Sequence, residues 1–354
     1  MSYDLSQLGW DETFASSYRP FDRADAAPGR VLRADRGIST VLTADGVTRA
    51  SLGGSALLEA ARDPAGLPCA GDWVVLRRWA DRRTTLELVL PRRTELIRRT
   101  ADKDSTGQVL AANMDTVAVV EPIHPEPDDA RVERLLALAF ESGADPLLVL
   151  TKSDTTTDPA AIARQLAQIA PGVPVLPVSV RQGTGVDELR RYVAPGRTCA
   201  LLGRSGAGKS TLANALAGTA VMPVQAIRDA DGKGRHTTAY RNLITIPGGG
   251  AVLDTPGIRG VGLLDTAAGL DRAFADVTEL AGRCRFDNCH HASEPGCAVQ
   301  AALTDGSLPP RRLANWRKLH SEVAIESGRR SERLARARRT RRSPFSGTTD
   351  AKLS

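Results

Sequence analysis

The chain has 354 residues, of which 42 % are hydrophobic and 25 % charged, and its formal net charge is +6. This composition is typical of a globular protein with two or three domains, each burying its own core. No apolar run approaches membrane-spanning length, and the acidic start MSYDLSQLGWDETF lacks the basic residues and apolar centre of a secretory signal. These features argue against a membrane or secreted protein and predict a cytoplasmic one.

Residues 1–24 show no sustained periodicity and are predicted to form a flexible or loosely docked arm. Residues 25–100 contain short apolar stretches broken by Gly and Asp, among them GRVLRADRGISTVLTADG, AGDWVVLRRW and LELVLPRRTELIRR. Short strands with turn signals and little helical periodicity predict a small β-barrel. An oligonucleotide-binding (OB) barrel is one such fold, although periodicity alone does not separate it from other small barrels.

Four pairs of arginines lie in the later part of this barrel segment, at positions 77–78, 82–83, 92–93 and 98–99. A single arginine pair usually does no more than solvate a surface. Four pairs within one short segment favour a polyanionic partner, and nucleic acid is the partner that we expect.

Residues 101–275 alternate apolar strands and amphipathic helices, beginning with DTVAVVEP, ARVERLLALAFES and PLLVL. This alternation is typical of an α/β domain with a mostly parallel sheet. PLLVL leads into TKSD, residues Thr151 to Asp154. Guanine presents two adjacent donors, N1–H and the 2-amino group, and one carboxylate such as that of Asp154 can accept both, whereas adenine lacks this pair.

The TKSD stretch resembles a guanine-binding loop, so Thr151, Lys152, Ser153 and Asp154 are predicted to bind the nucleotide, with the stem of Lys152 along the base. Ser179, in PVSVRQGTG, is a candidate for a second loop that supports the base from the other side. Thr151 stands where the usual pattern has Asn, so a hydrogen-bonding group is kept but the amide is lost. Taken alone, TKSD would favour a turn with a helix cap.

Further along, GRSGAGKS, residues 203–210, matches the phosphate-binding pattern G-x-x-x-x-G-K-[ST] between the strand TCALL and the helix STLANALAG. Backbone N–H groups and a helix N-terminus suit phosphate oxygens. Lys209 is predicted to contact the β- and γ-phosphates, and Ser210 to hold Mg²⁺. The bare pattern arises by chance, but here the strand and the helix are both in place. The predicted nucleotide-binding residues of this loop are Gly203, Arg204, Ser205, Gly206, Ala207, Gly208, Lys209, Ser210 and Thr211.

The stretch DTPG, residues Asp254 to Gly257, follows the apolar strand AVL. Asp254 can organise Mg²⁺ through its water, and the N–H of Gly257 can meet a γ-phosphate. D-x-x-G by itself is also a common turn after a buried strand. A phosphate-binding loop upstream at this distance favours the functional interpretation.

The guanine-binding loop therefore precedes the phosphate-binding loop, which reverses the order of an ordinary GTPase. We predict a circular permutation of the GTPase sheet, which closed α/β domains tolerate because their termini are often neighbours. The D-x-x-G stretch then lies near the end of the domain and leads directly toward a cysteine cluster.

That cluster, in CRFDNCHHASEPGC, places Cys284, Cys289, His291 and Cys297 at the spacing C-x4-C-x-H-x5-C within a segment spanning residues 276–328. Three thiolates and one imidazole predict a four-coordinate, structural Zn²⁺ site. His290 competes with His291 as the fourth ligand, and a disulfide or buried free thiols fit the cluster less well. Residues 329–354 are arginine-rich and then polar, which predicts a basic helix fraying into a disordered tail.

In combination, several stretches resemble the RsgA (YjeQ/YloQ) family of small-ribosomal-subunit biogenesis GTPases. They are RGISTVLTADG in the barrel, GRSGAGKSTL, GRHTT, DTPGIR, and the cysteine cluster with EPGCAV. The resemblance extends from about residue 29 to about residue 325. It implies an OB-fold, a circularly permuted GTPase domain and a zinc domain, with GTP hydrolysis stimulated by the small subunit during its late maturation, rRNA binding, and Zn²⁺ and Mg²⁺ as cofactors.

The resemblance also implies that Thr237 or Thr238 contacts Mg²⁺ and the γ-phosphate. Many GTPases have a water-positioning glutamine after the D-x-x-G glycine, but Ile258 stands there, so His236 is our hypothesis for that role. The catalytic set is then Lys209, His236, Thr237, Thr238, Asp254 and Gly257. One alternative function is an RNA-binding scaffold with a static guanine nucleotide, and a second, a P-loop kinase or ATPase, is opposed by Asp154. Nothing in the sequence suggests an oligomer, so a monomer is expected.

Overall fold

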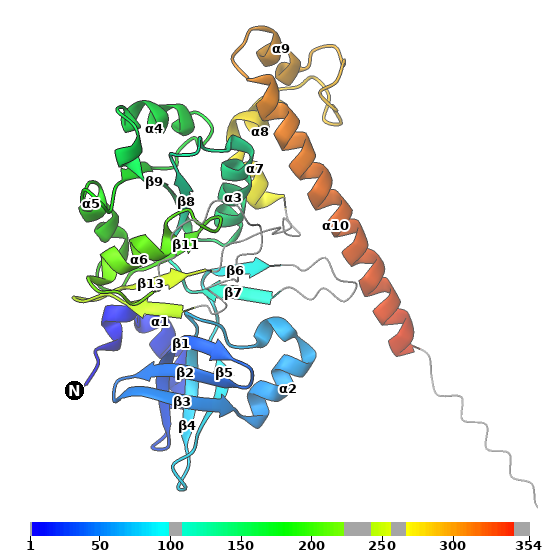
Figure 1. Ribbon diagram of the computed structural model, residues 1–354. Coiled ribbons are helices and arrows are strands. Elements are labelled where there is room, and N and C mark those ends of the chain that lie inside the picture. The colour runs from blue at the N-terminus through cyan, green and yellow to red at the C-terminus, as the bar shows by residue number, and fades with distance from the viewer. Residues whose placement is uncertain (1, 99–107, 223–241, 256–266, 343–354) are drawn as a thin grey trace, which may run out of the picture.

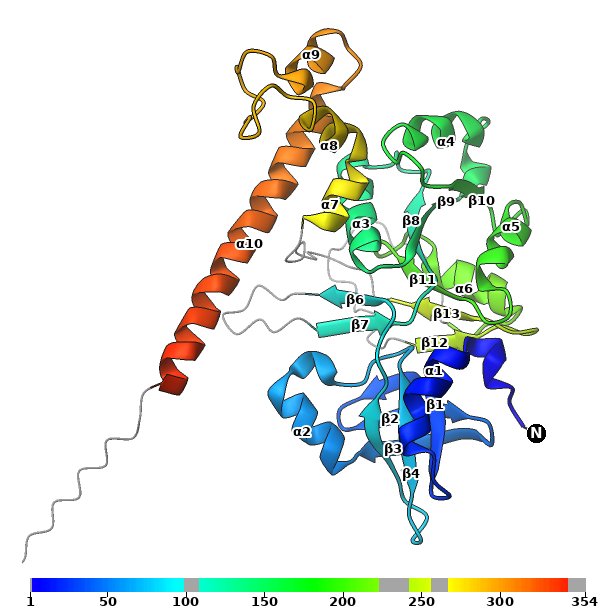
Figure 2. The same ribbon diagram turned by 180° about the vertical axis from the view of Figure 1, so that it is seen from behind.

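The computed structural model describes residues 2–98, 108–222, 242–255 and 267–342 (Figure 1). They form a β-barrel, an α/β lobe and a helical lobe that ends in one long helix. The view from behind shows that the barrel and the helical lobe lie at opposite ends of the α/β lobe (Figure 2). Among the described residues, no helix has both the length and the apolar character needed to cross a bilayer.

The barrel consists of five strands closed in the order β1-β2-β3-β5-β4, with the pair β3–β5 parallel and the other pairs antiparallel. Branched side chains fill its interior, including Val31, Val74 and Leu86. Helix α2 (Gly54–Arg62) connects β3 to β4, as expected for an OB-type barrel. The strands are β1 (Ala26–Asp35), β2 (Ile38–Thr43), β3 (Gly46–Leu52), β4 (Trp73–Arg78) and β5 (Thr84–Val89).

The N-terminal segment is folded against both the barrel and the α/β lobe. It forms η1 (Leu5–Leu8), α1 (Glu12–Tyr18) and η2 (Arg19–Phe21), and Leu5, Leu8, Phe14 and Tyr18 are buried. This differs from the flexible or loosely docked arm expected for residues 1–24. The expectation fails because these apolar side chains are irregularly spaced and find their partners, such as Trp73 of the barrel, only in the tertiary structure.

One backbone carbonyl of this segment ties the two lobes together. The carbonyl of Gln7 accepts hydrogen bonds from the backbone N–H groups of Gly196 and Gly250, at 2.9 and 2.6 Å. Both glycines belong to loops at one end of the α/β sheet, before β11 and β13. The N-terminal segment therefore joins the barrel to the sheet.

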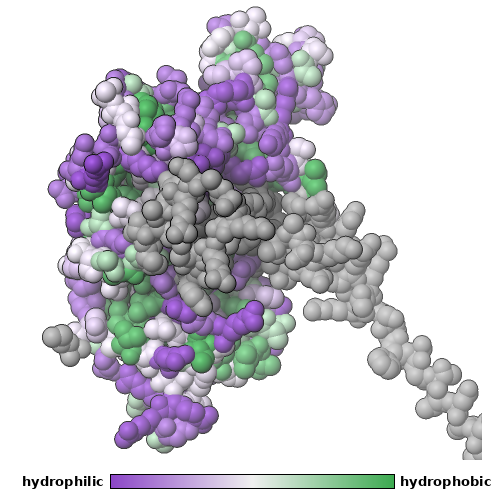
Figure 3. Space-filling view, in the orientation of Figure 1, coloured by the Kyte–Doolittle hydropathy of each residue, from purple (hydrophilic) through white to green (hydrophobic). Residues whose placement is uncertain are grey.

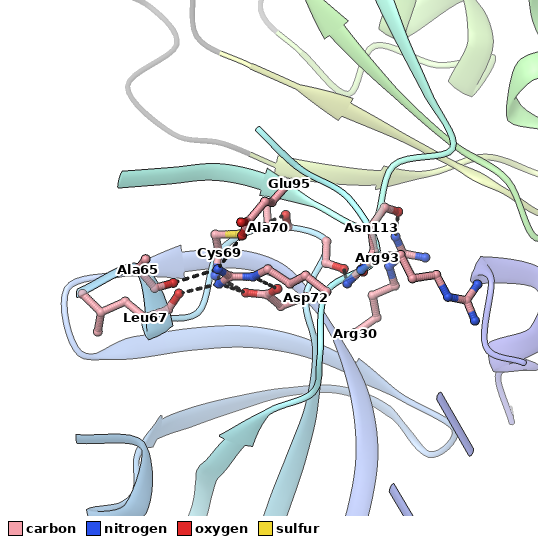
Figure 4. Close-up of polar contacts among 11 residues, drawn as sticks. Arg30, Ala65, Leu67, Cys69, Ala70, Asp72, Arg93, Glu95 and Asn113 are labelled. Atoms are coloured by element: carbon pink, nitrogen blue, oxygen red, sulfur yellow. Dashed lines mark hydrogen bonds and ion pairs between the residues drawn. The ribbon is translucent and has the colours of Figure 1, made fainter. Parts of the chain in front are cut away.

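A network of buried polar groups completes this joint (Figure 4). The Arg30 guanidinium, which is 1 % exposed, donates to the backbone carbonyls of Leu8 and Asn113. The Asn113 amide in turn donates to the carbonyl of Gly71 at 3.1 Å. Arg92 forms a two-bonded ion pair with the fully buried Asp72, at 2.7 and 2.9 Å. Because Arg92 and Asp72 neutralise each other and Arg30 donates to two carbonyls, the joint tolerates burial.

The α/β lobe has a six-stranded sheet in the order β10-β9-β8-β11-β13-β12, parallel except for β12. Every residue of β8 is buried, which is the pattern of a parallel strand covered on both faces. Alternate β8 residues enter different cores: Val117 and Val119 pack beneath α3, while Ala118 and Val120 pack beneath α5 and α6. The strands are β8 (Thr116–Pro122), β9 (Asp145–Thr151), β10 (Val175–Val178), β11 (Thr198–Leu202), β12 (Asn242–Thr245) and β13 (Ala251–Asp254), and the helices are α3 (Asp129–Glu141), α4 (Pro159–Ala167), α5 (Val186–Arg190) and α6 (Lys209–Ala217).

The order of strands along the chain differs from their order in the sheet. The strand preceding the phosphate-binding loop, β11, is the fourth strand of this sheet along the chain, yet it lies between β8 and β13. An antiparallel ribbon, β6 (Glu95–Arg98) and β7 (Gln108–Ala112), connects the barrel to the sheet. The loops with predicted chemistry thus lie at the carboxyl ends of β9, β10, β11 and β13, the edge where α/β sheets bind ligands.

The helical lobe contains α7 (Ala268–Ala273), α8 (Ala275–Ala281), α9 (Ala298–Thr304) and α10 (Pro310–Arg342). Its apolar side chains Val277, Val299 and Leu313 continue the core that lies beneath α3. Helix α10 extends far beyond this lobe (Figure 1). Its backbone is helical through Arg342, in agreement with a basic helix at the start of the predicted tail, and residues 343–354 lie outside the described part of the chain.

Candidate functional site

The phosphate-binding loop connects the carboxyl end of β11 to helix α6 (Figure 1). Two of its glycines are required by the backbone. A Cβ at Gly203 would lie 2.3 Å from the carbonyl oxygen of Val120, and Gly208, which precedes α6, has φ +96°. The loop can therefore lie against the sheet and present the N–H groups at the start of α6 to an anion.

Lys209 is the first residue of α6 and is 7 % exposed. Its ammonium group donates to the backbone carbonyls of Gly203 and Arg204, at 2.8 and 2.9 Å. Burial lowers its pKa, and the nearby Asp254 carboxylate opposes this effect. Phosphate oxygens are stronger acceptors than these carbonyls, so the buried cation suits a polyphosphate.

Asp254 ends β13, opposite Leu201 in the neighbouring strand β11. Its side chain is 1 % exposed, and neither carboxylate oxygen has a hydrogen-bond partner among the described residues. Burial raises its pKa to about 6, and Lys209 offsets part of that rise. A buried, unpartnered carboxylate next to a phosphate-binding loop fits Mg²⁺, which binds carboxylate and phosphate oxygens together.

The predicted guanine-binding loop follows β9 in a tight turn. Lys152 has φ +59°, and Ser153 and Asp154 form the short helix η4 (Ser153–Thr155). The Ser179 hydroxyl, fully buried after β10, donates to the Asp154 carboxylate at 2.7 Å and thereby lowers the pKa of Asp154. The structure thus brings Ser179 and Asp154 together, and it orients an ionised carboxylate that can accept hydrogen bonds.

Thr151 joins the guanine-binding loop to the phosphate-binding loop. Its hydroxyl donates to the backbone carbonyl of Ala207 at 2.6 Å, and its side chain lies 3.4 Å from where a Cβ of Gly208 would be. The sequence indicated only that this hydroxyl could form a hydrogen bond. No local pattern reveals the partner, because the two residues are 56 positions apart.

Several predicted residues lie outside the described part of the chain, namely His236, Thr237, Thr238, Gly257 and Ile258. Ser205, Gly206, Ser210 and Thr211 lie on the phosphate-binding loop and the first turn of α6, where they reach the surface wholly or in part.

The cysteine cluster lies in the segment between α8 and α9, and its last member, Cys297, caps the N-terminus of α9. The ligand atoms of Cys284, Cys289, His291 and Cys297 all lie within 4.8 Å of one another. The Nδ1 atom of His291 is 3.5 Å from the sulfurs of both Cys284 and Cys297. The latter two sulfurs are 3.8 Å apart, too far for a disulfide bond. This donor set can hold a metal ion, and His291 rather than the exposed His290 faces the thiols.

A carboxylate holds the loop of this cluster in shape. Glu294 accepts hydrogen bonds from the backbone N–H groups of His290, Ala292 and Ser293. The backbone N–H of Glu294 itself, together with these three groups, lowers the pKa of the carboxyl to about 2. The His291 backbone has φ +58°, which the loop stabilises. The arrangement therefore directs the imidazole toward the sulfurs of Cys284 and Cys297.

The model of the RsgA GTPase family matches residues 89–264. Over 321 residues the chain is 53 % identical to the small ribosomal subunit biogenesis GTPase RsgA of Streptomyces coelicolor, which covers 90 % of this chain and 86 % of that protein. The chain belongs to the RsgA GTPase family. A second member, from Opitutus terrae, is 41 % identical over 348 residues, which is 95 % of this chain and 94 % of its own.

Solved structures of the family share the fold. YjeQ from Thermotoga maritima aligns with a TM-score of 0.62 and 26 % identity, covering 84 % of this chain and 99 % of its own. YloQ, described as a circularly permuted GTPase, aligns with a TM-score of 0.60 and 23 % identity, covering 86 % and 96 %. The predicted permutation is thus confirmed, and membership of the RsgA family makes the chain a P-loop GTP hydrolase.

Proposed function

We propose that this chain hydrolyses GTP in step with the late maturation of the small ribosomal subunit, and that it binds rRNA. The main support is the extent of its similarity to the relatives named small ribosomal subunit biogenesis GTPase, which cover 90 % and 95 % of this chain. We propose a cytoplasmic monomer with a barrel over residues 25–100, a GTPase domain over 101–275 and a metal-binding domain over 276–328.

At the carboxyl edge of the α/β sheet, the ammonium group of Lys209 would replace its hydrogen bonds to the carbonyls of Gly203 and Arg204 with bonds to the β- and γ-phosphates. The Ser210 hydroxyl and Asp254 would hold Mg²⁺, directly or through water. The ion supplies positive charge that offsets the charge developing on the phosphates. Positioning and charge neutralisation account for the catalysis, and no covalent intermediate is needed.

Three further roles concern residues outside the described part of the chain. Thr237 or Thr238 would contact Mg²⁺ and the γ-phosphate, and the N–H of Gly257 would meet the γ-phosphate. His236 would position the attacking water, because Ile258 has no hydrogen-bonding side chain. If His236→Ala retained subunit-stimulated turnover, this role of His236 would be wrong.

Guanine selection rests on Asp154, which Ser179 holds in place. Asp154→Asn replaces one acceptor with a donor, so it should bind GTP poorly and bind xanthosine triphosphate, whose C2 carbonyl accepts that donor. The measurement is competition between GTP and xanthosine triphosphate for binding to the wild type and to Asp154→Asn. Equal GTP affinity of the wild type and Asp154→Asn would exclude Asp154 from base recognition.

For the cysteine cluster we propose one structural Zn²⁺ ion bound by Cys284, Cys289, His291 and Cys297. Three sulfurs and one nitrogen form the donor set that zinc prefers in closed four-coordinate sites. Elemental analysis of the purified chain should find one zinc ion, and His291→Ala should lose it while the control His290→Ala keeps it. The reverse pattern would assign the ligand to His290.

The central experiment measures GTP hydrolysis by the full chain with no subunits, with small subunits and with large subunits. We expect strong stimulation by small subunits only, and loss of turnover in Lys209→Ala. Binding of GTP and of small subunits without turnover would instead favour the RNA-binding scaffold.

A second experiment tests the arginine-rich end of the chain. A steeper salt dependence of subunit binding for the full chain than for one truncated after Ser327 would assign the eight arginines between residues 329 and 342 to the interface.

A further inference from the structure

The turn between β4 and β5 carries an exposed tryptophan among arginines. Trp79 is 38 % exposed, and Arg77, Arg78, Arg82 and Arg83 surround it in the chain. The hairpin projects beyond the barrel on the side away from the α/β lobe (Figures 1 and 2). Hydrophilic side chains gather at its tip, at the bottom of the space-filling view (Figure 3). A large aromatic ring in such exposed, charged surroundings is better explained by ligand binding than by packing in a hydrophobic core.

The indole is held in one orientation by its neighbours. Its N–H donates to the hydroxyl of Thr85 at 2.9 Å. The guanidinium of Arg77 lies over the ring, 4.0 Å from its centroid, whereas that of Arg83 is 5.9 Å away. Arg77 thus covers part of the ring, and the exposed remainder can receive a second flat group.

The backbone of the turn is equally well defined. The N–H of Trp79 donates to the carbonyl of Arg83, and the N–H of Arg82 donates to the carbonyl of Trp79, both at 2.9 Å. Arg82 has φ +67°, a conformation that residues other than glycine seldom adopt. The tip is therefore ordered before any ligand arrives, which reduces the entropy lost on binding.

The arginines around the ring are available for phosphates. Three of them pair with acids: Arg77 with Asp25, Arg78 with Asp45, and Arg83 with Asp81. In every pair both side chains are more than 40 % exposed. Exposed ion pairs of this kind are weak, so a phosphate can replace the carboxylate, and the acids hold the guanidinium groups in place until it does.

We infer that the β4–β5 hairpin is a docking element for an unpaired RNA base, with Trp79 as the stacking surface and Arg82 and Arg83 beside it for the adjoining phosphate. Aromatic rings flanked by arginines bind single-stranded nucleic acid in this way, and a base buried in a duplex cannot reach the ring. The inference rests on the proposed ribosomal role and specifies which element takes a base.

The test uses the full chain in three variants, Trp79→Leu, Trp79→Phe and Arg82→Gln. The probes are a labelled ten-nucleotide oligouridylate, an RNA duplex of the same length, and small ribosomal subunits. Trp79→Leu should weaken oligouridylate binding about ten-fold and leave duplex binding unchanged, while Trp79→Phe, which keeps an aromatic face, should recover most of the affinity.

The dependence of binding on salt separates stacking from charge. Trp79→Leu should keep the wild-type slope of log affinity against log salt, whereas Arg82→Gln should reduce that slope by about 0.7 for the single strand. Thermal melting and unstimulated GTP turnover serve as folding controls, because the β4–β5 hairpin lies at the end of the barrel remote from the α/β lobe that carries the phosphate-binding loop (Figure 1).

Wild-type affinity of Trp79→Leu for both oligouridylate and small subunits would overturn the inference. Weaker binding of Trp79→Leu to subunits, with both RNA probes unaffected, would overturn it in favour of a protein partner. The proposed function is tested separately, by whether small subunits stimulate GTP turnover of the wild type. The oligouridylate measurement tests the hairpin whether or not that stimulation occurs.

Discussion

The buried carboxylate of Asp254 makes stability depend on pH in a defined direction. Its pKa is about 6 in the folded chain against an ordinary value of 3.8, so folding favours the protonated form. The stabilising contribution is complete below pH 3.8 and is lost as the pH rises through 6. Mg²⁺ needs the ionised form, so its binding with nucleotide should release a proton below about pH 6.

Replacing Asp254 with Asn removes this titration. Without nucleotide or Mg²⁺, the free energy of unfolding of the wild type relative to Asp254→Asn should fall by up to about 3 kcal/mol between pH 4 and pH 7, as the carboxylate ionises in its buried position. Urea unfolding at four pH values measures the difference, with the exposed Asp287→Asn as control. A difference that stays constant with pH would contradict the assigned protonation.

The hydrogen bond from Thr151 to Ala207 should contribute to nucleotide affinity, because it holds two loops that bind different parts of the same ligand. Thr151→Val keeps the shape and removes the donor, leaving a buried carbonyl without this partner. We expect GDP affinity to fall about ten-fold. Fluorescent-nucleotide titration measures it, and Thr157→Val, at an exposed position after the loop, should bind GDP as the wild type does.

At the scale of elements, helix α10 is fastened to the GTPase lobe by one buried arginine. Arg312 is 1 % exposed, and it donates to the carboxylates of Glu133 in α3 and Asp276 in α8, at 2.8 Å each. It also donates to the carbonyls of Ile169 and Ala273 and lies 4.2 Å over the ring of Phe274. One side chain thus connects four segments.

Arg312→Ala would leave the buried Glu133 without its closest charged partner. The expected loss is about 3 kcal/mol in the free energy of unfolding. The neighbouring Arg311 is 47 % exposed, so Arg311→Ala should cost at most about 1 kcal/mol. Denaturant unfolding compares the free energies of unfolding of the two variants. Similar decreases in Arg312→Ala and Arg311→Ala would show that the buried Arg312 does not stabilise the attachment of α10 more than the exposed Arg311 does.

Elements whose contacts are local could be predicted from the sequence. The phosphate-binding loop has a strand before it and a helix after it, and the four candidate metal ligands lie within fourteen residues, so spacing alone indicated their chemistry. The bonds from Thr151 to Ala207 and from Arg312 to Glu133 span 56 and 179 positions. Periodicity carries no information about such distant partners, so the joints between lobes appear only in the structure.

For the molecule as a whole, the N-terminal segment should determine whether barrel and GTPase lobe unfold together. A chain lacking residues 1–24 loses the Gln7 carbonyl bonds and uncovers Trp73. We expect a lower unfolding midpoint and separate transitions by tryptophan fluorescence and far-ultraviolet circular dichroism. A chain lacking only residues 1–3 keeps η1 and should show one transition, as should the wild type. Coincident transitions in the longer truncation would show that the other contacts of the joint suffice.

The bond between Gln7 and Gly250 also sets an order on events during synthesis of the chain. These residues are 243 positions apart (250 minus 7), so at roughly 5–20 residues per second a translating ribosome makes the second one roughly 12 to 50 s after the first. The barrel strands, all before residue 90, can pair during that interval, but the N-terminal segment cannot complete its attachment to the sheet. Helix η1, the first element to be synthesised, is therefore among the last to reach its final position.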